Sequence, residues 1–278
     1  MPSGRALFSV LVVWTGGLAL AAPSATPPGL DPAGLKAWAQ YQKEATHRAF
    51  AIAPGGQWGW RSGLTDTDQA TEEALAACQE NGAICLAYDL NGRRLLSATG
   101  WERAFAPYPG ASTQVGTRRG QRFPDLRLQT SDGKPVSLVQ PEIRITILHF
   151  WGSWCPPCVR ELPNLAQTQK RLAKEPEIRF ILVPLREPMA TSQAWLQSHQ
   201  LNLSLTSTET APSNALKLTD GKTLSDRQMA PVFPTTYILD GNGTVLFSRH
   251  GPIHDWASLI PILRHAARNS AVDSPSRP

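Results

Sequence analysis

The sequence predicts an α/β protein with two folded parts, a small α+β domain followed by a larger α/β domain. The first observation behind this is an αββαββ pattern across residues 30–105. The second is a segment rich in Pro, Gly, Ser and Thr at residues 106–120, which we interpret as a linker. The third is an apolar, β-branched strand pattern at residues 143–150 that runs straight into two cysteines and a helical pattern. We therefore expect residues 121–267 to form the second domain.

Both ends of the chain differ from these domains. Residues 1–22 combine an n-region containing Arg5, a short apolar run and a small-x-small cleavage site, which is typical of a secretory signal peptide. An uncleaved anchor is the alternative, but the apolar run is short for a span of about 20 residues. We predict a periplasmic protein that meets the membrane only through export or an uncleaved signal. Residues 268–278 are polar and predict a disordered tail.

Charge and cysteine content limit the classes of function. The chain has 278 residues and a formal net charge of +5, yet no cluster of Lys and Arg lies on a predicted face. We therefore expect no nucleic-acid partner. Four cysteines in an exported chain favour disulfide bonds.

The first domain begins with a helix that Asp31 caps. A hairpin around residues 54–56 follows, then a second helix from Asp66 or Thr67 that ends at Asn81-Gly82. Strands at residues 83–90 and 93–98 then pair around Asn91-Gly92, a type I′ turn sequence.

One pair of cysteines lies within this domain. Cys78 is at the end of the second helix and Cys85 in the next predicted strand, so a structural disulfide there would contribute about 2–3 kcal/mol. Catalysis by this pair is not expected, because neither thiol is at a helix N-terminus. Trp58 and Trp60 point to one face of their strand and form either a binding surface or part of the core.

The other pair, Cys155 and Cys158, lies where a strand gives way to a helix. Unpaired backbone amides and the helix dipole stabilise an anion at the helix N-terminus, so the thiol pKa of Cys155 should fall and make it the nucleophile. Cys158, one turn inside the helix, suits the resolving role. Pro156 and Pro157 stiffen the loop between them.

The stretch FWGSWCPPCVRELP resembles the active site of the thioredoxin fold, in the TlpA/ResA-like branch of exported thiol-disulfide oxidoreductases. Residues 123–126 and 132–138 are similar to the N-terminal hairpin of that branch, and residues 232–240 to its cis-proline strand. These matches stand in the order of the family. Residues 30–105, with the run AFAIAPGGQWGW, resemble a family of small exported domains of unknown function.

The resemblance implies a thioredoxin-like fold, a central mixed sheet flanked by helices, preceded by the small α+β domain. It also implies that Pro234 is cis and lies against the disulfide, with the backbone of Phe233 free to pair with a substrate. Trp154 matches the aromatic residue that flanks the first cysteine, and Glu161 matches an acidic residue linked to proton handling. We expect substrates to contact Trp154, Pro156, Pro157, Phe233 and Pro234.

His149 departs from the family pattern. Thioredoxins have a buried Asp six residues before the first cysteine, and TlpA-like proteins usually have a neutral residue there. A buried His149 could take the proton from Cys158 during exchange. It could equally be a neutral core histidine with a backbone partner.

Together these features predict a thiol-disulfide oxidoreductase that reduces selected protein disulfides without a cofactor. Its partners would be disulfide-containing proteins and a membrane thiol donor that reduces it again. The process implied by the family branch is cytochrome c maturation. Residues 184–229 are longer than a minimal connection. They predict a helix at 192–199, a strand at 201–205 and then loop with some helix, with no role assigned.

Four alternatives stay open. A structural zinc site would need two closely spaced cysteine pairs, or one pair with spaced histidines, and we expect no metal. A copper-binding or copper-site-assembly chaperone uses two cysteines and a histidine, which His250 or His254 could supply, although its cysteines usually have three residues between them and not the two found here. The protein could also be a disulfide donor, and the first domain a module that docks a partner.

Overall fold

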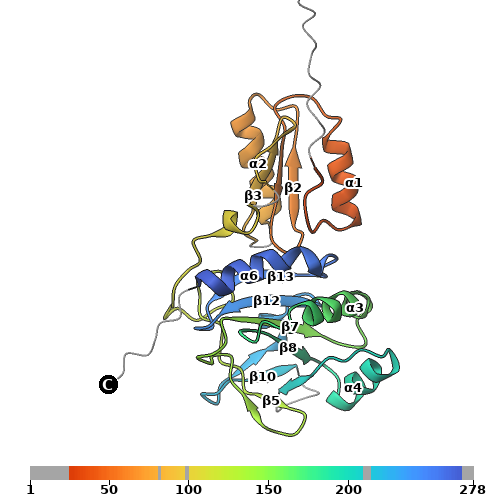
Figure 1. Ribbon diagram of the computed structural model, residues 1–278, viewed down its shortest axis with the longest axis vertical. Coiled ribbons are helices and arrows are strands. Elements are labelled where there is room, and N and C mark those ends of the chain that lie inside the picture. Colours follow the sequence, from red (N-terminus) through yellow and green to blue (C-terminus); the bar gives the residue numbers. More distant parts are fainter. Residues whose placement is uncertain (1–24, 81–82, 98–99, 209–213, 271–278) are drawn as a thin grey trace, which may run out of the picture.

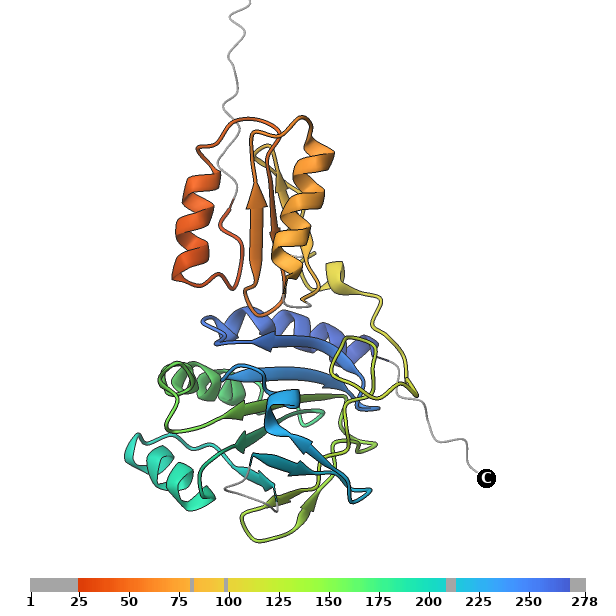
Figure 2. The ribbon, with the colours of Figure 1, turned by 180° about the vertical axis from the view of Figure 1, so that it is seen from behind.

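The computed structural model describes residues 25–80, 83–97, 100–208 and 214–270. The chain forms two stacked parts, seen from opposite sides in Figures 1 and 2. The N-terminal part lies over the face of the C-terminal part that carries α6 and β13. The signal peptide predicted at residues 1–22 and Asn81-Gly82 lie outside the described residues.

The N-terminal part is a four-stranded antiparallel sheet in the order β2-β1-β3-β4. Asp31 and Asp66 cap its two helices, as their sequence positions predict, by accepting hydrogen bonds from backbone amides three residues later. The elements in chain order are α1 (Pro32–Tyr41), β1 (Ala49–Ile52), β2 (Trp58–Arg61), α2 (Thr67–Gln79), β3 (Leu86–Leu90) and β4 (Arg93–Arg94).

The two faces of this sheet have different cores. On one face, small side chains let α2 approach closely, and a methyl group at Gly59 would lie 2.5 Å from the carbonyl oxygen of Ala74. On the other face aromatic rings pack together. Trp58 stacks on Phe50 and Trp60 meets the ring of Tyr41 edge-on. Of the two interpretations of these tryptophans, the ring contacts favour core packing.

The C-terminal part is built on a mixed sheet in the order β13-β12-β7-β8. The central strand β7 (Ile145–Trp151) is buried along its whole length and pairs parallel with β8 (Ile178–Pro184) and antiparallel with β12 (Thr235–Asp240). β13 (Val245–His250) forms the edge beside β12. The helices α3 (Pro156–Arg171) and α6 (Ile260–Asn269), with the 3₁₀ helix Trp256–Leu259, pack beside this sheet (Figure 1).

Smaller elements complete this part. A three-stranded sheet contains β5 (Leu128–Thr130), β6 (Pro135–Val136) and β9 (Thr206–Thr208), in the order β6-β5-β9. A hairpin and a short helix precede the cis-proline strand. The remaining elements are the 3₁₀ helix Arg103–Phe105, α4 (Met189–Ser198), β10 (Ala215–Lys217), β11 (Thr223–Ser225) and α5 (Asp226–Met229).

Several predicted boundaries differ from the structure. The strand predicted at residues 201–205 is wrong. β9 begins at residue 206, where the backbone pairs with β5, a distant partner that local sequence does not reveal. Of the strand predicted at residues 93–98, the described residues 93–97 contain only the two-residue strand β4, and Cys85 precedes β3. The helix predicted at 192–199 starts earlier, and residues 268 and 269 belong to α6. Within the described residues, no helix is both long and apolar enough to cross a membrane.

Candidate active site

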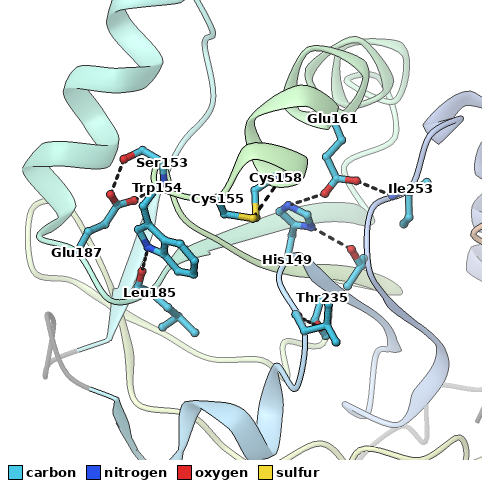
Figure 3. The surroundings of a disulfide bond; sticks show 12 residues. His149, Ser153, Trp154, Cys155, Cys158, Glu161, Leu185, Glu187, Thr235 and Ile253 are labelled. Atoms are coloured by element: carbon cyan, nitrogen blue, oxygen red, sulfur yellow. Dashed lines mark hydrogen bonds and ion pairs between the residues drawn. A yellow bond between two sulfur atoms is a disulfide. The ribbon is translucent and has the colours of Figure 1, made fainter. Parts of the chain in front are cut away.

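The disulfide between Cys155 and Cys158 lies at the start of α3 (Figure 3). Cys155 caps the helix, and its Sγ accepts a hydrogen bond from the Cys158 amide at 3.3 Å. Pro156 and Pro157 occupy the first turn, where a missing N–H costs no helical hydrogen bond. The first sulfur therefore lies where amide dipoles stabilise a thiolate, as predicted for a nucleophile.

A histidine and a glutamate lie face to face beside this disulfide (Figure 3). His149 projects from β7 and is fully buried, and Glu161 projects from α3, one turn after Cys158. The distance between His149 Nε2 and Glu161 Oε1 is 3.3 Å. His149 Nδ1 lies 2.9 Å from the Thr236 hydroxyl, and Glu161 Oε2 accepts the Ile253 amide at 2.6 Å. His149 thus has side-chain partners and not the backbone partner that one alternative expected.

Burial determines the charge of this pair. It lowers the pKa of His149 to about 3 and raises the pKa of Glu161 to about 8, although the Ile253 amide opposes the second shift. At neutral pH both groups are therefore mainly uncharged. The arrangement that fits is a Glu161 O–H that donates to His149 Nε2, with His149 Nδ1–H donating to Thr236. A pocket of about 180 Å³ borders Glu161 and His254 on the α3 side.

A second buried carboxylate holds the loop before Cys155. The two oxygens of Glu187 accept the Ser153 amide at 2.7 Å, the Ser153 hydroxyl at 2.5 Å and the Ser192 hydroxyl at 2.6 Å. Trp154, the residue after Ser153, donates its indole N–H to the carbonyl of Leu185 at 2.9 Å (Figure 3). Glu187 thereby fixes the turn that presents Trp154 and Cys155.

The peptide bond between Phe233 and Pro234 is cis, as the resemblance implied. Thr235 lies opposite Phe150 in the antiparallel register, so the residues before Thr235 run past the loop that carries Cys155. Phe233 meets the ring of Trp154 edge-on at 5.1 Å between centroids. Trp154 is 45 % exposed, whereas Phe233 is 8 % exposed. The predicted substrate-contacting residues Trp154, Phe233 and Pro234 therefore lie together.

The comparisons with known proteins agree with this geometry. Residues 119–248 match the AhpC/TSA family. These residues form a thioredoxin-like domain. The thioredoxin-like protein YneN of Bacillus subtilis is 28% identical over 152 residues, which cover 54% of this chain and 81% of YneN. Thiol-disulfide oxidoreductase ResA of Bacillus subtilis is 26% identical over 146 residues, covering 51% and 75%.

Among solved structures, that of a putative thiol:disulfide interchange protein DsbE from Chlorobium tepidum is 23% identical, with a TM-score of 0.43. It covers 54% of this chain and 99% of that one. The family match, the named relatives and the mixed sheet together identify the thioredoxin-like domain as that of a thiol-disulfide oxidoreductase. The family match does not include the N-terminal sheet, which ends before residue 119.

Sequence reasoning missed several residues around the thioredoxin-like site. Thr236, Glu187 and Asp226 carry no local signal, because their partners lie far away in the sequence. Asp226 is buried and pairs with Arg186 at 2.5 and 3.1 Å. The length of residues 184–229 was the one hint, since both ends of that ion pair fall within it.

The histidines considered for copper have other partners. His250 Nδ1 is 3.3 Å from the Thr235 hydroxyl, and His254 is exposed, with its carbonyl bound by Asn164. Within the described ranges, no three His, Cys, Asp or Glu side chains are grouped so as to hold a metal ion. The other disulfide joins Cys78 and Cys85, with an S–S distance of 2.05 Å.

Proposed function

We propose that the protein reduces selected protein disulfides, with Cys155 as nucleophile and Cys158 as resolving thiol. The observation that carries this proposal is the position of Cys155 at the N-cap of α3, beside a cis-proline and an exposed Trp154. The Cys155 thiolate attacks a substrate sulfur, forms a mixed disulfide and releases the first substrate thiol. Cys158 then attacks Cys155, which restores the protein disulfide and releases the second. Two electrons and two protons pass to the substrate.

The buried pair supports a proton-transfer role in this exchange. Cys158 must lose its proton to attack, and a free thiol has a pKa near 8.5. A carboxyl of pKa about 8 is closely matched to it, so the ionised fraction of Glu161, which grows as the pH approaches 8, can accept this proton at little cost. His149 lies 3.3 Å from that carboxyl, in a position to hold its orientation or pass the proton. We assign Glu161 and His149 to this step.

The cellular setting follows from the first residues and from the family branch. A signal sequence at residues 1–22 would place the protein in the periplasm, which is kept oxidising. A reductant there needs electrons from a membrane thiol donor. We propose cytochrome c maturation as the process. A deletion strain with normal amounts of c-type cytochrome would contradict it.

A redox titration of the mature protein tests the direction of electron flow. The protein is equilibrated in thiol–disulfide buffers, and the two pairs of cysteines are separated by mass spectrometry of alkylated peptides. A midpoint below about −250 mV for Cys155 and Cys158 would support a reductant, whereas one above about −150 mV would indicate a disulfide donor. The absence of any reversible transition would contradict the oxidoreductase and make copper binding the next hypothesis to test.

A further inference from the structure

Five residues form a continuous surface beside the disulfide, which we call the Phe233 collar. It consists of Trp154, Arg186, Arg227, Val232 and Phe233. The guanidinium carbons of Arg186 and Arg227 lie 5.3 and 5.7 Å from the centroid of the Phe233 ring, and the Trp154 ring meets it edge-on. Val232 is 50 % exposed. A substrate that reaches Cys155 past the cis-proline must cross this surface.

The accessible charge of the collar is positive. Arg186 is neutralised by Asp226, whose side chain is 1% exposed. Arg227 is exposed and donates to the carbonyl of Pro231 at 2.8 Å, and no carboxylate of the described residues forms an ion pair with it. Glu187 cannot offset this charge at the surface, because it is buried and its oxygens accept three hydrogen bonds. One uncompensated cation therefore remains beside the entry to the disulfide.

This cation is held in place before a substrate arrives. Arg227 lies in α5, whose start is closed by a capping box between Ser225 and Gln228. The preceding residue, Asp226, accepts hydrogen bonds from Arg186, which lies in the loop after β8. A guanidinium already fixed over an aromatic ring loses less side-chain entropy when it binds a carboxylate.

We propose that the Phe233 collar selects disulfides in acidic segments, in which a carboxylate lies next to the cysteine that Cys155 attacks. Arg227 provides the charge, and Trp154 with Val232 provides apolar contact for the flanking side chain. The inference rests on the proposed function, since it names the class of substrate for the same site. The insertion at residues 184–229, which carries both arginines, thereby acquires a role in specificity.

The test uses three short peptides, each with one cysteine capped as a methyl disulfide and flanked on both sides by Glu, Gln or Lys. In the reduced protein, the Cys155 thiolate attacks the disulfide of the peptide, and Cys158 then completes the exchange. One peptide thiol and one methanethiol are released for each protein disulfide formed. The rate of peptide thiol release is followed by mass spectrometry. The ratio of rates between peptides is used, so that a general loss of activity does not imitate a loss of preference.

We expect the Glu peptide to react about two- to fivefold faster than the Gln peptide, the range for one exposed ion pair. The Lys peptide should react more slowly than the Gln peptide. The preference should fall in 1 M salt, where the screening length drops to about 3 Å. Arg227→Gln should bring the ratio of Glu to Gln peptides close to one, and Arg227→Lys should keep most of it. Arg93→Gln, an exposed change on β4 of the other sheet, is the matched control and should leave the ratio unchanged.

Each other outcome is decisive. Equal rates for the three peptides, or a preference for Lys, would overturn the acidic specificity while the proposed reductase stands. A preference for Glu that survives Arg227→Gln would overturn the assignment to the collar. If the reduced protein released no thiol from any peptide, the proposed function would fail and this inference with it.

Discussion

The two disulfides of this protein are alike in burial and opposite in position. Cys78 and Cys85 are 3 % and 5 % exposed, and Cys155 and Cys158 are 3 % and 0 % exposed. Cys78 lies in the last turn of α2, at the helix end that carries the unpaired carbonyl groups. Cys155 lies at the N-terminal end of α3, where the Cys158 amide donates a hydrogen bond to its sulfur. Burial alone therefore does not separate a structural disulfide from a reactive one, whereas helix polarity does.

The surroundings of the two disulfides also differ. Cys78 and Cys85 lie in a cluster of alanines between α2 and the N-terminal sheet. Cys155 and Cys158 have the buried pair of His149 and Glu161 beside them, and Trp154 exposed in front. Under the proposed function, the first site only holds its sulfurs, whereas the second also moves protons and meets a partner.

The largest effect should come from the nucleophile. Cys155→Ser should lower the rate of disulfide reduction by at least about 10³-fold, because a hydroxyl cannot replace the thiolate. The measurement is thiol release from the neutral methyl-disulfide peptide. Replacing both Cys78 and Cys85 by Ala should leave that rate within about twofold of the unmodified protein. Comparable losses in both variants would erase the distinction between the two disulfides.

For the stability of the fold, the disulfide between Cys78 and Cys85 should matter more than it does for activity. The Cys78→Ala, Cys85→Ala variant should lose about 2–3 kcal/mol of the free energy of unfolding, because the bridge closes a short loop in the unfolded chain. Urea denaturation followed by circular dichroism measures this. The oxidised unmodified protein is the reference, and an unchanged midpoint would show that this disulfide is not structural.

The loop before Cys155 provides a sharper test of what positions the reactive pair. Glu187→Gln should lower the free energy of unfolding by about 1–2 kcal/mol, since an amide nitrogen cannot accept the hydrogen bonds from Ser153. It should also slow peptide reduction and shift the fluorescence of Trp154, whose loop is released. The control is Glu72→Gln, on the exposed surface of α2. Gln57→Glu on the N-terminal hairpin is not suitable, because the Gln57 side chain donates a hydrogen bond to the Ser248 carbonyl. Equal fluorescence in the Glu187 and Glu72 variants would contradict the positioning role.

The smallest effect at neutral pH should come from the buried pair. The folded protein keeps a proton on Glu161 up to a pKa of about 8, and the unfolded chain releases it near 4.5. His149 has the opposite behaviour, uncharged in the folded state down to a pKa of about 3 and protonated near 6.5 when unfolded. Between about pH 4.5 and 6.5 the effects of the two groups on the pH dependence of stability cancel. Above this window the free energy of unfolding falls with rising pH, because folded Glu161 retains its proton; below it the free energy of unfolding falls with decreasing pH, because folded His149 resists protonation.

Glu161→Gln isolates one side of this profile. It mimics the protonated acid, so the decline in unfolding free energy between about pH 6.5 and 8 should disappear, and the rise on the acid side due to His149, no longer cancelled, should continue to about pH 6.5. Urea unfolding at pH 5.5, 7 and 8 measures this, with Glu72→Gln again as the matched variant. A Glu161→Gln profile that declines like the unmodified protein would show that Glu161 is ionised in the folded state.

Elements were predicted correctly where the residues that form them are close together in the sequence, and incorrectly where the hydrogen-bonding partners are far apart in the sequence. The helix caps at Asp31 and Asp66, the strand before Cys155 and the helix after it all follow from local spacing and apolar periodicity. The strand predicted at 201–205 was wrong, because β9 forms only where a backbone 70 residues or more away offers its hydrogen bonds. The hairpin β10–β11 was not predicted although its two strands are close in the sequence, and α5 lies in the segment predicted as loop with some helix.

The sequence by itself determined that Cys155, the proposed nucleophile, would stand at a helix N-terminus, because strand, turn and helix are contiguous there and helix polarity follows from chain direction. Only the tertiary structure decided what surrounds it. It brought His149 of β7 to Glu161 of α3, closed Glu187 on Ser153 and set two arginines over Phe233. Those contacts join residues that are neighbours only after the sheet has formed, and burial, which changes their protonation, exists only in the folded protein.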